Sequence, residues 1–304
     1  MDALSAIVAL LKPQAVGAKL IHGAGRWGVR YPAFGLASYA LVLKGKCWLA
    51  ADGVPARTLE TGDFVLFPST PRFTLASSPK VRPKQVETVD SSQQVEEIFH
   101  GDQGEEPSAS LLGGYFTFDA VSSPVITGLL PKMLYLRAGH PSAIGIAPVV
   151  ELISREALEN RAGQPFVLRR LVEIMLIECL RSASTELTAK GLLTGLRDVR
   201  LAAALHAIHV RAAHPWTLVT LAREACMSRS SFADHFSRIL GVTPLRYLLQ
   251  WRLAMARDLL SRGQMTVAEI ALAVGYESSS GFSIAFSREM GQSPRAFVKQ
   301  HITE

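Results

Sequence analysis

Hydrophobic residues in the last third of the chain recur with helical spacing in two similar blocks. In the first block they predict two short helices, with apolar positions Leu218, Leu221, Ala222 and Ala225, followed by Phe232, Phe236 and Leu240. The equivalent positions of the second block are Val267, Ile270, Ala271 and Val274, followed by Phe282 and Phe286. Each block predicts a helix, a tight turn and a helix. Two copies are too few for a solenoid, so the pattern indicates tandem helix-turn-helix units.

Turn and cap residues support both units. Ser228 is expected to cap a helix that ends near Leu240. In the second block Gly275 supplies the turn, and Ser278 or Ser279 caps a helix that ends near Met290. A long apolar helix from residue 244 to residue 260 begins at a proline and should hold the two units at a fixed spacing.

The first half of the chain shows a different pattern. Short apolar runs broken by Gly and Pro predict strands at residues 18–21, 38–44, 47–50, 64–67, 73–76, 96–100 and 111–118. Hairpin turns are expected at residues 44–46 and at Asp52-Gly53. Short strands at even spacing predict a small antiparallel barrel. Two helices, at residues 149–160 and 166–181, follow, and a polar linker at residues 182–193 leads into the helical part.

Positive charge is concentrated on the tandem unit. Residues 197–304 contain 13 Lys/Arg and 8 Asp/Glu, whereas residues 1–196 contain 19 and 18, so +5 of the net +6 lies in the last third. This excess suits a polyanionic partner. A solvated basic face is the alternative, and the helix-turn-helix pattern favours double-stranded DNA.

Residues 216–300 resemble the DNA-binding domain of AraC-type transcription regulators. The most specific match is GYESSSGFSIAFSREMGQSP at residues 275–294, with Gly-Tyr before the turn and Gly-x-Ser-Pro after the second helix. In that family two recognition helices enter adjacent segments of the major groove. Carried over by position, the resemblance implies that base edges are faced by Ser230, Ala233, Asp234, Ser280, Gly281 and Ile284. Phosphate contacts are assigned to Arg229, Arg238, Arg252 and Arg288, and Ser231, Ser279 and Ser283 complete the predicted DNA-binding set.

The base-facing positions depart from the family pattern. Several commonly hold Arg, Gln or Trp, but this chain has Ala233, Asp234, Gly281 and Ile284 there. Ile284 suits a thymine methyl group, and Asp234 suits a cytosine amino group. The phosphate assignments also have an alternative, because each arginine could instead pair with Glu224, Asp258 or Glu289.

Residues 1–140 resemble the cupin-type N-terminal half of a subgroup of the same regulators. The match rests on Gly62 to Pro68, on the start DALSAIVALLKP and on RWGVRYP at residues 26–32. A metal cupin needs about three imidazoles and a carboxylate, yet residues 34–44 contain no His, and the position after Pro68 where one is expected holds Arg72-Phe73. We therefore expect no metal, no cofactor and no enzyme activity. A metal-dependent cupin enzyme fused to a DNA tether and an effector-independent DNA binder are the rival interpretations.

An effector, if bound, would be a carboxylated or planar small molecule at the mouth of the barrel. Aromatic and arginine residues near that mouth are Arg26, Trp27, Tyr31, Tyr39, Trp48, Arg72 and Phe73. Trp27 and Arg72 are the preferred contacts, with Tyr39 and Trp48 beside them. For each of these aromatic side chains taken singly, packing in the core is the favoured interpretation.

The predicted fold is a multi-domain α+β protein. Residues 1–145 form the cupin-like barrel, residues 146–195 a helical linker or dimerisation segment, and residues 196–304 the all-α DNA-binding domain. The wide apolar face of helix 166–181 predicts burial, either against the barrel or in a dimer seam. The family resemblance favours the seam and a homodimer.

Cysteines and hydropathy indicate the compartment. Cys47, Cys179 and Cys226 lie far apart in apolar surroundings, so reduced thiols and a cytoplasmic location are expected. The start of the chain lacks the basic region of a signal peptide. No apolar run approaches the ~18 residues of a membrane span, so no membrane partner is expected. The sequence leaves open whether the regulator activates or represses.

Overall fold

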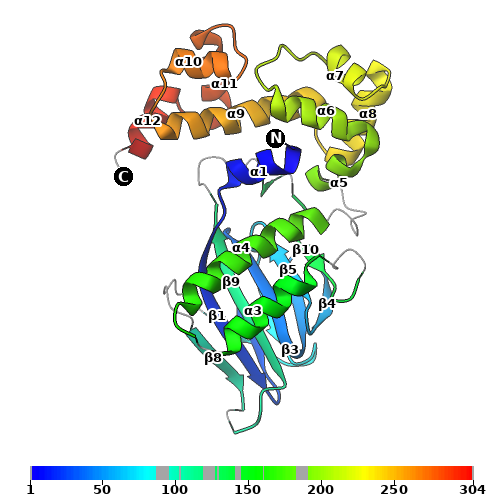
Figure 1. The fold of residues 1–304 in the computed structure, drawn as a ribbon, viewed down its shortest axis with the longest axis vertical. Coiled ribbons are helices and arrows are strands. Elements are labelled where there is room, and N and C mark those ends of the chain that lie inside the picture. The colour runs from blue at the N-terminus through cyan, green and yellow to red at the C-terminus, as the bar shows by residue number, and fades with distance from the viewer. Residues whose placement is uncertain are drawn as a thin grey trace. The chain divides into compact units, whose positions relative to one another are not determined.

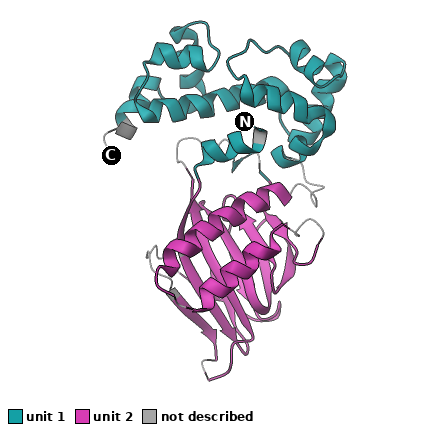
Figure 2. Cartoon of the chain, in the orientation of Figure 1, with its two compact units in different colours: residues 1–12, 119–130, 187–304 teal, residues 13–118, 131–186 magenta. Residues whose placement is uncertain are grey.

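The structure is a computed structural model that describes residues 2–86, 96–102, 104–118, 127–128, 130–140, 145–159, 161–182 and 191–302. Its internal contacts divide the chain into two compact units (Figure 2). Residues 13–118 and 131–186 form one, called here the half-barrel unit. Residues 1–12, 119–130 and 187–304 form the other, called here the helical unit.

The half-barrel unit is built on one ten-stranded sheet. Its strands are β1 (Gln14–Ala24), β2 (Gly28–Tyr31), β3 (Ala37–Ala51), β4 (Val54–Glu60), β5 (Phe64–Phe67), β6 (Phe73–Ala76), β7 (Lys84–Gln85), β8 (Glu96–Gly101), β9 (Ala109–Thr117) and β10 (Leu134–Leu136). The order is β7-β2-β6-β3-β9-β1-β8, with β4 and β5 paired to β3, and β10 to β5. Pairing is antiparallel except for β1 with β8 and β2 with β7. The predicted α+β class is confirmed, while the two parallel pairings were not foreseen.

The predicted turn at residues 44–46 is wrong. β3 runs without a break from Ala37 to Ala51, and its register against β9 shifts between Val42 and Lys44. Gly45 there has φ 76°, and a Cβ on it would lie 1.9 Å from the carbonyl oxygen of Ser108. Glycine is therefore needed here by the close approach of the Ser108 backbone, just after the bulge in β3, rather than by a hairpin turn. The second predicted turn is confirmed, since Gly53, with φ 76°, connects β3 to β4.

Two helices cover the sheet of the half-barrel unit (Figure 1). They are α3 (Ala147–Glu159) and α4 (Gln164–Ser182). α4 packs on β1 and β10 with its apolar face, which contains Leu168, Val172, Met175, Leu176 and Leu180. The favoured interpretation of this face as a dimer seam is wrong, because the chain's own sheet already buries it.

The helical unit contains α1 (Ala3–Leu11), α5 (Leu192–Arg197), α6 (Val199–Val210), α7 (Leu218–Glu224), α8 (Arg229–Leu240), α9 (Pro244–Arg262), α10 (Val267–Ala273), α11 (Ser279–Met290) and α12 (Pro294–Ile302). The predicted ends of α8 and α11 are confirmed, and each helix is followed by a left-handed glycine, Gly241 or Gly291, as its C-cap. Ser228 caps α8 as predicted, and Ser278 rather than Ser279 caps α11.

The first helix belongs to the helical unit. α1 packs against α6 and α9, and Lys12 directly after it forms an ion pair with Asp258 of α9. Asp258 is buried and also pairs with Arg262 at 2.6 Å. The division at residues 145 and 195 stays a prediction, and residues 183–190 of the predicted linker lie outside the described residues. Within the described part of the chain, no helix has the length and apolar character needed to cross a membrane.

Candidate nucleic-acid interface and ligand cavity

The two helix-turn-helix units are built in the same way. A capping box starts the first helix of each, Thr217 with Thr220 in α7 and Thr266 with Glu269 in α10. Two phenylalanines of the second helix lie in the core with their ring centroids 5.5 Å apart in both units. α9 runs between the two helix-turn-helix units (Figure 1). The repeated sequence pattern therefore produces two equivalent helices, α8 and α11, each with one buried face and one exposed face.

The predicted base-facing residues lie on the outward side of these helices. Ser230 and Asp234 are exposed and Ala233 is half-buried on α8, while Ser280 and Gly281 are exposed at the start of α11. Ile284 is 70% exposed. Contact of these residues with bases stays a prediction.

The predicted phosphate-binding arginines differ in their surroundings. Arg229 is exposed, and among the described residues its side chain has no ion pair or hydrogen bond. The Arg288 side chain is 68% exposed, and its Nε lies 3.5 Å from Glu289 Oε1. A contact of that length on the surface contributes little to stability, so both side chains can reach a phosphate.

Arg252 instead makes hydrogen bonds within the helical unit. Its Nε donates to the carbonyl of Ala212 at 2.9 Å, and its Nη2 donates to the carbonyl of His214 at 2.8 Å. Burial lowers the pKa of Arg252. These contacts favour an intramolecular role. The partners are carbonyl groups rather than the expected carboxylates, because Glu224 pairs with Arg211 and Glu289 with Arg246.

Arg238 forms a hydrogen bond with His235, a residue that the sequence analysis did not include in the site. Its Nη2 lies 2.7 Å from His235 Nδ1, and His235 Nε2 lies 2.7 Å from Asp198 Oδ2. Burial alone would raise the pKa of Asp198, but hydrogen bonds from the Leu201 amide and from His235 outweigh it and lower that pKa. A guanidinium cannot accept, so His235 Nδ1 must accept and Nε2 must carry the hydrogen. Only the fold brings Asp198 next to α8.

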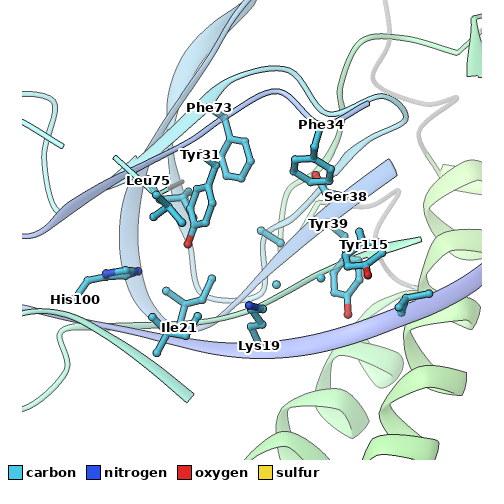
Figure 3. A pocket seen from close by; sticks show the side chains of 16 residues that line it. Lys19, Ile21, Tyr31, Phe34, Ser38, Tyr39, Phe73, Leu75, His100 and Tyr115 are labelled. Atoms are coloured by element: carbon cyan, nitrogen blue, oxygen red, sulfur yellow. The ribbon is translucent and has the colours of Figure 1, made fainter. Parts of the chain in front are cut away.

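A cavity of about 280 Å³ lies in the half-barrel unit. Its walls are mainly apolar and aromatic, and Tyr31 and Phe73 stack with centroids 4.8 Å apart. Lys19, Tyr31 and His100 direct their polar ends into it (Figure 3). The lining residues are Val16, Lys19, Ile21, Tyr31, Phe34, Ser38, Tyr39, Ala40, Phe73, Leu75, Val86, Ile98, His100, Gly113, Gly114 and Tyr115.

Only part of the predicted effector set lines this cavity. Tyr39 does so, together with Tyr31 and Phe73. Trp27 is 2% exposed in the core, where its ring fills the space left by Gly23, and Trp48 is half-buried outside the lining. The Arg72 side chain is 64% exposed and pairs with Asp52 at 3.2 Å. The preferred pair, Trp27 and Arg72, is not part of this lining, and its contact with an effector stays a prediction.

Sequence reasoning missed Lys19 and His100. Lys19 and Ile21 share one face of β1 because alternate residues of a strand point the same way, and both line the cavity. A lysine at an inward position of an apolar strand was the available signal. His100 stacks near Trp27, and burial together with the charge of Lys84 lowers its pKa, so the imidazole is neutral at pH 7.

The residues present do not fit a cupin metal centre. No group of three or more His, Cys, Asp or Glu gathers anywhere in the described segments. His22 of β1 interacts through Nδ1 with the Ser110 hydroxyl at 3.0 Å. Cys47 and Cys179 are buried as expected, whereas the expectation of an apolar environment for Cys226 is wrong, because it is exposed in the first turn.

Comparisons with known proteins agree with this two-part architecture. Residues 2–185 match the cupin family model, and residues 221–300 match a helix-turn-helix domain model. An AraC-like transcription regulator of Streptomyces lividans is 33% identical over 98% of both chains. The transcriptional regulator AlkR of Acinetobacter baylyi is 30% identical over 99% of this chain and 100% of its own. The solved structure of ToxT from Vibrio cholerae covers 95% of this chain and 98% of its own, with 12% identity and a TM-score of 0.37.

The chain belongs to the AraC-like transcription regulators. It is a DNA-binding regulator with an N-terminal cupin region and a C-terminal helix-turn-helix region.

Proposed function

We propose that this regulator binds its operator through α8 and α11 and that a small molecule in the half-barrel cavity controls this binding. The observation that carries the proposal is that one chain combines two presented recognition helices with a cavity of about 280 Å³. Side chains of both helices that face outward supply the base contacts, and Arg229, Arg238 and Arg288 contact phosphates. The barrel serves as a binding module rather than as an enzyme.

The proposal that the chain is not an enzyme rests on its chemistry. The cavity is lined by aliphatic and aromatic side chains, and its titratable groups are a lysine, a histidine and three tyrosines. Burial raises the pKa of Tyr31 to about 12, so this phenol keeps its proton. A small-molecule binding site typically has such apolar and aromatic walls, with a few polar groups that fix the orientation of the ligand.

We also propose a cytoplasmic homodimer. Large apolar side chains of α3 and α4 remain exposed although both helices cover the sheet, namely Leu152, Leu158, Phe166, Val167 and Ile174. A second copy of the chain would bury such a surface. Sedimentation of the wild type and of Leu158→Asp/Phe166→Asp tests this, since the variant should be monomeric at the same concentration.

Selection of bound fragments from a random DNA pool tests the DNA-binding part. A regulator should enrich one sequence, and its affinity for that sequence should fall with salt with a log-log slope of roughly −4 to −8. A pool that shows no enrichment, together with salt-dependent binding to all fragments, would indicate an architectural DNA binder. The control by a ligand is tested separately, by measuring the same affinity with and without a compound that stabilises the protein.

A further inference from the structure

Two arginines are diagonal neighbours on adjacent strands of the half-barrel sheet. Arg30 of β2 lies opposite Thr74 of β6, and Arg72 comes two residues before Thr74. Alternate residues of a strand point to the same face, so both arginines lie on the face opposite Tyr31 and Phe73, which turn into the cavity (Figure 3). Both arginines line two adjoining surface hollows of about 230 and 330 Å³, called here the arginine site.

One nitrogen of each guanidinium already has a partner. Arg30 Nε donates to Thr74 Oγ1 at 3.2 Å, and Arg72 Nε lies 3.2 Å from Asp52 Oδ2. Among the described residues, the Nη groups of both side chains have no hydrogen bond and no ion pair. The Nε contacts therefore orient each guanidinium and leave its Nη donors available for a ligand.

Positive charge exceeds negative charge at the arginine site. Arg30 and Arg72 are both cations, and Asp52 is the only acidic group among the described residues that line the two hollows. The side chains of Arg72 and Asp52 are each 64% exposed, and an ion pair so open to solvent contributes little to stability. Like charges on neighbouring strands repel each other, so an anion that both guanidiniums bind would relieve this repulsion.

A phosphate group matches these donors better than a carboxylate does. Guanidinium forks bind phosphate oxygens in pairs, and a phosphate monoester carries a charge of about −1.5 to −2 at pH 7 with several acceptor oxygens. A carboxylate carries a single charge, and one fork is enough to bind it. The Thr74 hydroxyl accepts from Arg30 and can donate its own hydrogen to a phosphate. The Gln85 amide, opposite Arg30 on β7, is a further donor at the larger hollow.

The larger hollow has room for more than the phosphate itself. Its lining continues from the arginines to the apolar side chains of Pro32, Ala33 and Val86. These side chains can pack against the carbon atoms of an ester. The volume of about 330 Å³ falls within the range of about 300–1,000 Å³ found for small-molecule sites. The arginine site therefore suits a small phosphorylated molecule.

We propose that Arg30 and Arg72 bind the phosphate of a small phosphate monoester, at a site separate from the half-barrel cavity and from the recognition helices. The Nη groups of both arginines and the Thr74 hydroxyl donate to the phosphate oxygens, and the organic part of the ligand lies along Val86. Asp52 competes with the phosphate for Arg72. The arginine site goes beyond the proposed function, because neither DNA binding nor the cavity requires it.

Phenyl phosphate, inorganic phosphate and phenyl sulfate test the proposal by calorimetry on the full chain at low salt. Phenyl phosphate should bind most tightly, and phenyl sulfate, which has a similar shape but one charge, should bind roughly 10-fold more weakly. Arg30→Gln and Arg72→Gln should each weaken phenyl phosphate roughly 10-fold or more, because each removes charge-assisted hydrogen bonds. Asp52→Asn should strengthen its binding, because the competing carboxylate is lost.

Two control variants locate the bound phosphate. Arg26→Gln is the matched control, because Arg26 is an exposed arginine of the same unit that lies outside both hollows. Arg229→Gln/Arg288→Gln removes the proposed phosphate contacts of the recognition helices. Both control variants should bind phenyl phosphate as the wild type does.

Four results would overturn the proposal. They are no binding of phenyl phosphate, equal affinity for phenyl sulfate, wild-type affinity in Arg30→Gln and Arg72→Gln, and a loss confined to Arg229→Gln/Arg288→Gln. Equal affinity for inorganic phosphate would overturn the ester and make the free ion the ligand. Should an arginine variant fail to fold, as thermal unfolding without ligand would show, the comparison of phosphate with sulfate on the wild type and on Asp52→Asn decides.

Discussion

Cys226 and Gly275 occupy the same place in the two helix-turn-helix turns, and both have the left-handed backbone conformation, with φ of 50° and 85°. In each turn the following amide donates to a carbonyl five residues earlier, Met227 to Ala222 at 2.9 Å and Tyr276 to Ala271 at 2.8 Å. A Cβ at Gly275 would lie 2.8 Å from the Ala213 carbonyl oxygen. The first turn accepts a side chain at this place, and the second does not.

Cys226→Gly should raise the free energy of unfolding by up to about 1 kcal/mol. The left-handed conformation costs an L-residue roughly 1–2 kcal/mol, and the added freedom of glycine in the unfolded chain offsets part of the gain. Cys226→Ala, which keeps the backbone cost, is the control and should change little. Gly275→Ala should lose about 2 kcal/mol or more. Urea unfolding followed by circular dichroism measures all three, and destabilisation by Cys226→Gly would contradict the strain at this turn.

His235 should position Arg238 for DNA. His235→Asn keeps an acceptor where Nδ1 lies, and His235→Gln keeps a donor where Nε2 lies. If Arg238 contacts phosphate, the Gln variant should lose about one unit of the salt slope of operator binding, as Arg238→Ala does, and the Asn variant should retain it. The double variant His235→Gln/Arg238→Ala should lose no more than either one. Additive losses would mean that the two side chains act separately.

Arg229 and Arg252 should respond to substitution in opposite ways. Arg229→Ala should flatten the salt slope by about one unit with no change in melting temperature, because the side chain is exposed. Arg252→Ala should cost about 2 kcal/mol of stability, because the carbonyls of Ala212 and His214 lose a charged donor. Operator titrations at several salt concentrations and thermal unfolding of both variants check this. A flattened slope with unchanged stability in Arg252→Ala would restore its assignment to phosphate.

Phe286→Ala should destabilise the helical unit by about 3–5 kcal/mol. Phe286 is fully buried between Phe282 and Phe297, with ring centroids 5.5 Å and 5.6 Å away. Leu272→Ala is the control, since Leu272 of α10 is 63% exposed, and it should change stability by less than about 0.5 kcal/mol. Denaturant titration of both variants distinguishes them, and equal stabilities would contradict the packing of α11.

Acid should destabilise the helical unit through His209. Burial lowers the pKa of His209 to about 3, below its usual 6.5, and the ring lies 4.0 Å from Trp251. The unfolded chain therefore binds a proton below pH 6.5 that the folded chain does not bind until about pH 3. Stability should be fully present above pH 6.5 and fall by about 1.4 kcal/mol per pH unit below it. In His209→Phe this part of the pH dependence should disappear, and an unchanged curve would remove His209 as its cause.

Much of the helical unit could be predicted because helices are specified by residues that lie close together in the sequence. Helical periodicity placed the ends of α8 and α11 near Leu240 and Met290, and the choice left open between Ser278 and Ser279 concerned adjacent residues, because each cap lies next to the helix that it ends. The short runs of β5 and β6 were found for a similar reason, because a few alternating residues mark a strand. Gly45 was mistaken for a turn residue, since the need for glycine there comes from the close approach of Ser108, which lies far along the chain.

The sequence alone determined the two-part architecture, the family and the positions of α8 and α11. Tertiary structure decided which groups meet: Lys19 with Tyr31 and His100 in the cavity, His235 with Asp198, Arg252 with two carbonyls, and α4 with the sheet. It also grouped the first helix with the helical unit through Asp258, 246 residues from Lys12. Periodicity and caps act over a few residues, whereas these contacts depend on chain segments that only folding brings together.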